Sequence, residues 1–232
     1  MLKHRSLQQE QMDNLHLAGD ELHQTLDGLS VINRYLGNTN ASLQAVKKEI
    51  LQAKVPLKII DLGCGGGDNL RAIAAWAAQQ GYPVTLTGID GNANTLEYAR
   101  AKNTSLIQVR YLQADILNPS FSLPACDILM SSHFMYHFSD EALIGFLRKA
   151  KERGTGKILF SELQRSTLAY LLFKIGTPFL PFSRMVKQDG LQAIRRSFTR
   201  KELISIFQRA GIKAYRIQWK WAFRWMVSAG LS

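Results

Sequence analysis

Cysteine is nearly absent from this sequence, which has 232 residues and only two cysteines, Cys64 and Cys126. Two thiols cannot build the disulfide framework of a small secreted domain, and their spacing is not that of a metal site. The first ten residues contain no apolar run of the kind found in signal peptides. We therefore expect a cytoplasmic protein that works in a reducing compartment and binds no metal.

Long hydrophobic runs are absent as well. The most apolar stretch, residues 168–182, is interrupted by Pro178 and Pro181. It is shorter than the roughly 20 apolar residues that a membrane-spanning helix needs. With 46% hydrophobic and 20% charged residues, the chain has an ordinary globular composition, which excludes a disordered protein.

Acidic residues are scarce: 18 Asp and Glu stand against 29 Lys and Arg, which gives a formal net charge of +11. Such an excess favours anionic partners, namely nucleic acid, a peripheral contact with an anionic membrane, or an anionic small molecule. The alternative is a solvated basic surface that has no specific partner.

The N-terminal fifth of the chain has helical periodicity. Apolar residues recur at helical spacing between Leu15 and Leu36, which predicts one or two amphipathic helices over residues 5–36 that end at Gly37. Residues 40–42 are predicted to cap a further helix, which Pro56 closes.

After Pro56, short apolar strands alternate with helical segments. This alternation predicts a parallel, doubly wound α/β sheet. The expected strands are residues 57–60, 84–89, 107–112, 126–131 and 157–161, and the expected helices are residues 70–80, 93–102 and 140–152.

The alternation stops at residues 163–198. Thr199 and Glu202 then have the spacing of a capping box and predict a helix through Arg209. Residues 215–225 alternate aromatic or apolar with polar side chains, which is typical of one long strand or of a hairpin that turns near residues 219–222.

A glycine-rich loop, DLGCGGGDN over residues 61–69, directly follows the first predicted strand. A doubly wound sheet binds nucleotides at this place, and glycines let the backbone approach a ligand. A dinucleotide fingerprint would need glycine at position 68, where this chain has Asp68. Carboxylates around the loop would repel a pyrophosphate, whereas they suit a cationic ligand that carries an amino group and a sulfonium.

Aspartates follow the first three predicted strands at Asp61, Asp90 and Asp115. An acid at the end of the second strand can accept hydrogen bonds from both ribose hydroxyls. Asp115 can accept one from the adenine amino group, and Ile116 can pack on the ring. Each aspartate alone would be a helix cap or a turn residue, but three behind a glycine loop favour a ligand site.

This set of motifs resembles motifs I, II and III of the class I S-adenosylmethionine (SAM) dependent methyltransferases, over about residues 55–225. Within that family the chain is most similar to small-molecule methylases of the ubiquinone and menaquinone biosynthesis type, in a branch associated with polyketide-type biosynthesis. The shared residues include 131–140, 168–170, 189–190, 196–199 and 223–224. The resemblance implies SAM as the cofactor. It implies contacts to SAM from Asp61, Gly63, Cys64, Gly65, Gly67, Asn69, Asp90, Gly91, Asn92, Asp115, Ile116 and Ser131.

The same resemblance implies a Rossmann-like, mostly parallel seven-stranded sheet with an antiparallel C-terminal strand. We expect N-terminal helices over the cofactor in residues 1–54 and a SAM-binding core in residues 55–162. A helical substrate cap is expected in residues 163–198, and residues 199–232 complete the core.

His133 and His137 follow the fourth predicted strand, beside the expected methyl group. A hydroxyl acceptor must lose a proton, and histidine titrates near neutral pH. His137 matches the family pattern and is the first candidate for the base, although both histidines could simply pack or cap a helix. Asp140 is expected only to start that helix. The cap predicts a small, lipophilic, phenol-like or quinol-like acceptor. Its polar headgroup would be held by polar residues of the cap, namely Arg184, Lys187, Asp189, Arg195 and Arg196.

Two other functions stay open. An RNA methyltransferase would account for the positive charge, but the chain has no Asn-Pro-Pro-Tyr-like motif, no Pro-Cys nucleophile after the fourth strand and no appended basic module. We therefore expect no nucleic-acid partner. The other alternative is a SAM-binding regulatory protein that does not catalyse.

Overall fold

The computed structural model describes residues 2–53, 55–103 and 107–231. Seven strands form one sheet in the order β3-β2-β1-β4-β5-β7-β6. The strands β1 to β5 are parallel, and β7 runs antiparallel to both β5 and β6. Their bounds are β1 Leu57–Leu62, β2 Val84–Asp90, β3 Val109–Gln113, β4 Ile128–Ser132, β5 Lys157–Leu163, β6 Tyr215–Lys220 and β7 Arg224–Gly230. The predicted doubly wound sheet with an antiparallel C-terminal strand is confirmed.

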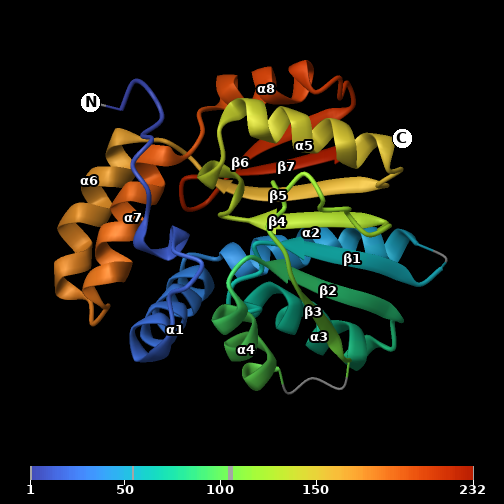
Figure 1. Ribbon diagram of the computed structural model, residues 1–232, viewed down its shortest axis with the longest axis horizontal. Helices are drawn as coiled ribbons and strands as arrows, with labels where there is room; N and C mark the ends of the chain where they lie inside the picture. Colours follow the sequence, from blue (N-terminus) through green and yellow to red (C-terminus); the bar gives the residue numbers. More distant parts are fainter. Residues whose placement is uncertain (1, 54, 104–106, 232) are drawn as a thin grey trace.

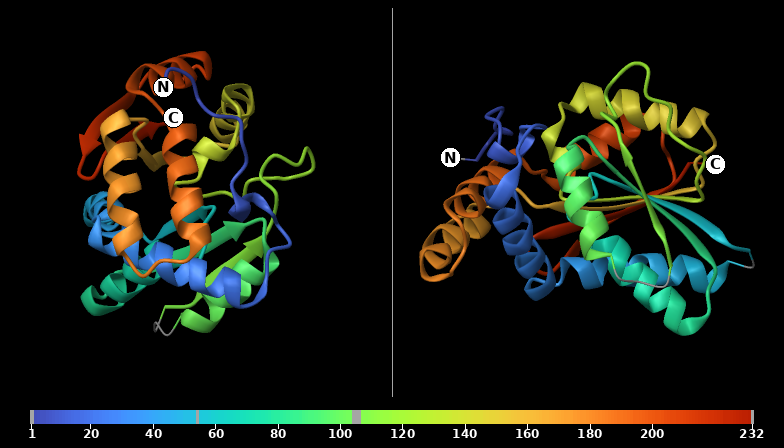
Figure 2. Two further views of the ribbon diagram at one scale, coloured as in Figure 1. Left: turned by 90° about the vertical axis from the view of Figure 1, so that its left-hand side faces the viewer. Right: turned by 60° about the horizontal axis from the view of Figure 1, so that its bottom comes forward.

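Helices cover both faces of the sheet and one of its ends (Figure 1). One face packs against α2 and α3 and the other against α5 and α8, and each interface has its own apolar cluster. The helices α1, α6 and α7 lie beyond the carboxyl ends of the parallel strands, as Figures 1 and 2 show. The α-helical bounds are α1 Gly19–Tyr35, α2 Asn38–Gln52, α3 Asp68–Gln80, α4 Ala93–Lys102, α5 Asp140–Glu152, α6 Thr167–Gly176, α7 Arg184–Arg196 and α8 Arg200–Arg209, and the 3-10 turns are η1 Gln11–Asp13, η2 Met135–His137 and η3 Thr177–Phe179.

Local signals fix several of these boundaries. The Thr199–Glu202 capping box is present at the start of α8, as predicted. Ser139 caps α5, which begins at Asp140. The cap of α2, predicted at residues 40–42, lies three to five residues earlier, because Gly37 adopts a left-handed conformation (φ 77°) and the helix starts directly at Asn38. The C-terminal alternation proves to be a hairpin, with β6 and β7 joined by residues 221–223.

The N-terminal prediction was wrong for residues 5–18. The helix begins only at Gly19, and the segment before it is extended except for η1. We call residues 2–17 the N-terminal strap, because they run along α7 and across the carboxyl end of the sheet (Figure 2). The strap is held there by hydrogen bonds rather than by an apolar stripe, so hydrophobic periodicity could not reveal its conformation.

In the part of the chain that the structure describes, no helix is long and apolar enough to cross a membrane. The segment predicted as a cap, residues 163–198, contains α6, η3 and α7 at the outer edge of the molecule.

Candidate functional site

The glycine loop joins β1 to α3 at the carboxyl edge of the sheet. Gly63, Gly65 and Gly67 all have positive φ angles, of 61°, 52° and 78°. A side chain on Gly63 would collide with the ring of Phe134, whereas one on Gly65 would meet nothing within 4 Å. The loop therefore packs closely on the protein at one glycine and leaves open space at the next.

Asp61 is the buried acid beneath this loop. It is 1% exposed, and neither of its carboxylate oxygens has a hydrogen-bond partner within the described chain. Burial raises the pKa of Asp61 to about 8, the nearby charges of Asp90 and Asp68 raise it further, and Asn69 partly offsets the rise. A buried carboxyl group without a partner costs free energy, which a cationic hydrogen-bond donor would recover.

Asp90 lies at the end of the neighbouring strand β2. Its two oxygens accept hydrogen bonds from the backbone amides of Gly65 and Asn92, both at 3.0 Å. Burial raises the pKa of Asp90, and these amides and the charge of His137 offset part of that rise. Asp90 therefore fastens the glycine loop to β2, and each oxygen keeps a further lone pair for a ligand.

The other residues predicted to contact SAM lie in different environments. The Asn92 side chain caps α4 and donates to the Leu17 carbonyl at 2.9 Å, so it is already engaged. The Cys64 thiol packs in the core, where burial raises its pKa, so only its backbone can face a ligand. Asp115 is exposed and accepts a hydrogen bond from the Leu117 amide at 2.9 Å. Ile116 is 6% exposed and belongs to the core beneath α5.

Two further positions lie at the rim of the site. A side chain on Gly91 would come within 2.9 Å of Leu15, so the N-terminal strap covers this turn closely. Ser131, in β4, is 1% exposed, and its hydroxyl has no partner among the described residues. Beside the strap is an open cleft of about 510 Å³, lined by Gln9, Glu10, Gln11, Asp13, Asn14, Leu17, Glu21 and Met185.

His137 lies in η2, and the strap supplies its partner. Its Nδ1 is 2.5 Å from Oδ1 of Asp13. Burial alone would raise the pKa of Asp13, but hydrogen bonds and charges from His137 and Arg196 outweigh it and hold that pKa at about 2. Asp13 is therefore ionised at neutral pH and fixes the orientation of the imidazole ring.

Arg196 connects α7 to the strap. It forms ion pairs with Asp13 at 2.6 Å and Glu10 at 3.3 Å, and it donates to the His137 carbonyl at 3.0 Å. Asp189 accepts hydrogen bonds from the amides of Gln11 and Met12, both at 3.0 Å. Both residues were predicted to hold an acceptor's headgroup, but they bind the strap instead.

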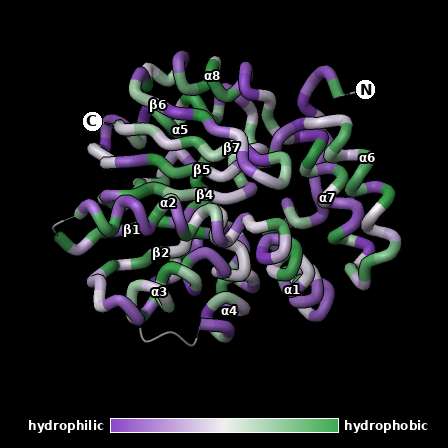
Figure 3. The backbone as a smooth tube through the Cα atoms, turned by 180° about the vertical axis from the view of Figure 1, so that it is seen from behind, coloured by the Kyte–Doolittle hydropathy of each residue, from purple (hydrophilic) through white to green (hydrophobic). Residues whose placement is uncertain are grey.

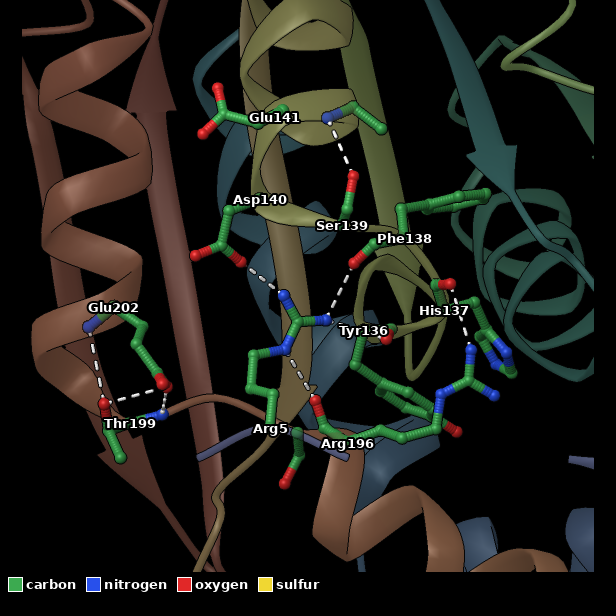
Figure 4. A network of polar contacts seen from close by, with 12 residues as sticks. Arg5, Tyr136, His137, Phe138, Ser139, Asp140, Glu141, Arg196, Thr199 and Glu202 are labelled. Atoms are coloured by element: carbon green, nitrogen blue, oxygen red, sulfur yellow. Dashed lines mark hydrogen bonds and ion pairs between the residues drawn. The ribbon is translucent and has the colours of Figure 1, made fainter. Parts of the chain in front are cut away.

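Arg5 fastens the start of the strap to the same loop (Figure 4). Its guanidinium pairs with Asp140 and donates to the carbonyls of Tyr136 and Phe138, both at 2.8 Å. The Asp140 side chain thus anchors the strap, in addition to the helix-start role predicted for that residue. The strap and the His137 loop form one connected polar network.

His133 has a different environment. The residue is half-buried, and its Nε2 atom is buried without a hydrogen-bond partner in the described structure. Burial and the charge of Arg224 lower the pKa of His133 to about 3. A neutral imidazole with so low a pKa is a poor base at neutral pH.

Sequence reasoning missed Asp13 and Glu162. Asp13 lies in a segment predicted to be helical, 124 residues before its partner, and no local pattern identifies it. Glu162 is fully buried in β5, accepts from the amides of Phe134 and Met135, and has a pKa raised by burial to about 8. An acid within an apolar strand was a signal that could have been noticed.

Comparison with known proteins agrees with this geometry. Residues 59–153 match the family model described as "Methyltransferase domain". The chain is 32% identical over 130 residues to the ubiquinone biosynthesis O-methyltransferase of Actinobacillus pleuropneumoniae, covering 53% of each protein. It is 26% identical over 162 residues to that of Klebsiella pneumoniae, covering 69% of this chain and 63% of the relative. The chain thus spans between about half and two thirds of the length of these relatives.

Solved structures show the same fold at low identity. Human N-acetylserotonin methyltransferase, in complex with SAM, aligns with a TM-score of 0.62 and 15% identity, over 90% of this chain and 55% of that one. Magnesium protoporphyrin IX methyltransferase from Synechocystis, with bound SAH, aligns with a TM-score of 0.56 and 15% identity, over 84% of both chains. Residues 59–153 are thus similar to a methyltransferase domain, and the chain shares the fold of these SAM-binding methyltransferases.

Proposed function

We propose that this protein binds SAM and transfers its methyl group to the hydroxyl of a small phenol-like or quinol-like acceptor. The observation that carries the proposal is the unpartnered carboxyl group of Asp61, buried beneath a glycine loop that has open space at Gly65. The similarity to ubiquinone biosynthesis O-methyltransferases supports the same reaction.

The residues around the loop fit this cofactor. Asp61 lies where it can accept from the amino group of the methionine part, and Asp90 has lone pairs for the ribose hydroxyls. Asp115 is exposed at the end of β3, where it can accept from the adenine amino group. Bound SAM would supply an electrophilic methyl group on a sulfonium, whose positive charge suits this acidic part of the sheet edge.

His137 is the proposed general base. Because Asp13 accepts from Nδ1, the ring presents Nε2 as the nitrogen that can take a proton from an acceptor hydroxyl. Asp13 also stabilises the imidazolium that forms. The low pKa of His133 makes that residue the weaker candidate.

The proposal is tested by two measurements on the full chain. Calorimetry with S-adenosylhomocysteine should show binding, and tritium from methyl-labelled SAM should appear in at least one member of a panel of phenols and quinols. Binding without transfer to any acceptor would support the non-catalytic alternative. Salt-sensitive RNA binding at physiological ionic strength would support the RNA methyltransferase instead.

A peripheral contact with an anionic membrane is the second part of the proposal, supported by the outer face of α6. This apolar helix lies at the edge of the molecule (Figure 3), and Lys174 and Arg184 beside it are exposed. Its exposed large apolar side chains, with those of η3 and the residue after it, are Leu168, Leu171, Leu172, Ile175, Phe179 and Leu180. An amphipathic face with basic neighbours is typical of segments that lie on anionic lipid.

Flotation with vesicles tests this contact. We expect the protein to float with vesicles rich in phosphatidylglycerol more than with pure phosphatidylcholine, and Leu172→Asp should reduce the bound fraction. Leu51→Asp, at an equally exposed leucine of α2, is the matched control and should leave binding unchanged. Equal loss in both variants, or no flotation of the unaltered protein, would refute the contact.

A further inference from the structure

A buried guanidinium at the carboxyl edge of the sheet has no acid opposite it. Arg224 begins β7, pairs in register with Leu163 at the end of β5, and is 1% exposed. Its terminal nitrogens donate to the carbonyls of Trp221 at 2.6 Å and Leu36 at 3.3 Å, and in the described chain its Nε has no partner. Burial lowers its pKa to about 10, so the side chain stays charged at neutral pH.

This arrangement is costly unless something else uses the charge. Moving a charged group out of water costs several kcal/mol, and buried charges in proteins are normally paired. The carbonyls of Trp221 and Leu36 could be satisfied by a neutral donor, so they do not explain a cation at this position.

A second unsatisfied nitrogen lies on the same edge of the sheet. His133 directly follows β4, which only β5 separates from β7, and its Nε2 is buried and unpartnered within the described residues. A neutral imidazole can donate one hydrogen bond from this nitrogen. Arg224 and His133 thus present two unused polar nitrogens on the carboxyl edge of the sheet.

The backbone around these two residues is strained. His133 (φ 53°) and Phe223 (φ 50°) are the non-glycine residues with positive φ in the described chain. Such conformations cost about 1–3 kcal/mol each and persist where the surrounding structure holds them. Asn38 provides that support, because its amide bridges the hydroxyls of Ser132 at 2.6 Å and Ser161 at 2.7 Å.

Exposed aromatic residues flank the two carbonyls to which Arg224 donates. Trp221, whose own carbonyl accepts one of these hydrogen bonds, is 66% exposed, and Tyr35, next to Leu36 at the end of α1, is 82% exposed. Exposed aromatic side chains beside a buried cation suit a ligand that combines an aromatic ring with a negative charge.

We propose that Arg224, assisted by His133, is the anion-binding residue of the acceptor site and selects an aromatic acceptor that carries a carboxylate. The carboxylate accepts hydrogen bonds from the guanidinium and the imidazole, while the aromatic ring of the acceptor contacts Trp221. This inference rests on the proposed function, because only methyl transfer makes the ligand an acceptor. Binding of the anion, however, can be measured without methyl transfer.

The test uses two probes of the same shape and different charge, 2,4-dihydroxybenzoate and 2,4-dihydroxybenzamide. Calorimetry on the full chain at pH 6.5, with saturating S-adenosylhomocysteine, should show the acid binding at least about tenfold more tightly, since a hydrogen bond to a charged group is worth about 1.5–3 kcal/mol. Arg224→Gln should remove this preference and leave the affinity for the amide within about threefold. Arg216→Gln, at an exposed arginine of β6, should change neither.

Each outcome decides something. If the unaltered protein binds the amide as tightly as the acid, the proposal is overturned without any variant. If Arg224→Gln has lost its cooperative thermal unfolding, Arg224→Lys, which keeps the charge, should retain a preference for the acid. A retained acid preference without methyl transfer to any phenol would refute the proposed function and leave the anion site standing. Methyl transfer at a rate that does not depend on the carboxylate would support the proposed function and refute the anion site.

Discussion

The two parts of the ligand edge carry unpaired ionisable groups of opposite kind. On β1 and β2, the buried Asp61 and the half-buried Asp90 are acids with no cationic partner in the described chain, and Asp61 has no hydrogen-bond partner either. On β7, Arg224 is a buried cation with no acidic partner in the same residues. The strap is the reverse case, since both of its acids, Glu10 and Asp13, pair with Arg196.

This difference separates ligand sites from structural ion pairs. A protein that needed these charges only for folding would pair them, as it does in the strap. Leaving an acid unpaired at one end of the edge and a base at the other prepares that edge for two ligands of opposite charge. In the proposed reaction a sulfonium would occupy the β1–β2 end and an anionic acceptor the β7 end.

The largest effect is expected from removing the base. His137→Ala should lower the rate of methyl transfer by about 10²–10⁴-fold, the usual contribution of general base catalysis. Binding of S-adenosylhomocysteine should stay unchanged, and Asp13→Asn should give a smaller loss together with a shifted pH–rate profile. A transfer rate for His137→Ala equal to that of the unaltered protein would eliminate the base assignment alone.

Changing the acid at the β1 end of the edge is expected to weaken cofactor binding. Asp61→Asn should weaken S-adenosylhomocysteine binding by about 100-fold, because losing one partner of a buried charged hydrogen bond costs about 2–5 kcal/mol. Asp20→Asn, at an exposed acid in the first turn of α1, is the control. Calorimetry on both variants makes the comparison, and unchanged affinity in Asp61→Asn would contradict the site.

The unliganded protein should lose stability as the pH rises. Asp61, Glu162 and Glu10 have pKa values raised by burial to about 8, so between about pH 4.5 and pH 8 the folded state holds protons that the unfolded state has released. Each such group lowers the free energy of unfolding by up to about 1.4 kcal/mol per pH unit.

Thermal or urea unfolding between pH 6.5 and pH 8 measures this slope. That range lies above the transition of His133, whose lowered pKa acts in the opposite direction at lower pH. The Asp61→Asn variant should show a shallower slope than the unaltered protein. Stability that rises over this range would show that the three carboxyl groups are ionised in the folded state.

The smallest expected effect is the energetic coupling between Asp61 on β1 and Arg224 on β7. β1 and β7 are three strand steps apart in the sheet, which is about 14 Å at about 4.8 Å per step. Changes in unfolding free energy for Asp61→Asn and Arg224→Gln should therefore add within about 0.5 kcal/mol in the double variant. A larger interaction energy would mean that the two charges compensate each other directly, which would weaken the comparison above.

The sequence predicted the acidic end of the edge and not the basic one, for a physical reason. Asp61, the glycine loop and Asp90 directly follow strands, so a local pattern places them at one edge of a parallel sheet. Arg224 sits at a polar position of an alternating pattern, which is typical of a strand with one solvated face. The structure buries it because β7 lies between β5 and β6 and the α1–α2 junction covers that end.

The strap could not be predicted because its contacts are polar and distant in sequence. Arg5, Asp13 and Asp189 hold it in place, and none of them belongs to a periodic pattern. The helix boundaries at Ala93 and Asp140, in contrast, were predicted to the residue, since each follows a local capping side chain. Capping is a property of neighbours in sequence, whereas the environment of His137 depends on a segment 124 residues away.

Asp13 lies far from its partners in the sequence, and this separation decides when their contacts can form during synthesis of the chain. The strap is synthesised before the loop of His137, and Arg196 and β7 follow later still. A nascent chain can fold its first strands around the glycine loop well before the His137–Asp13 pair exists. The glycine loop and its acids can thus be in place during biosynthesis before α7 supplies Arg196, which ties Asp13 to the loop of His137.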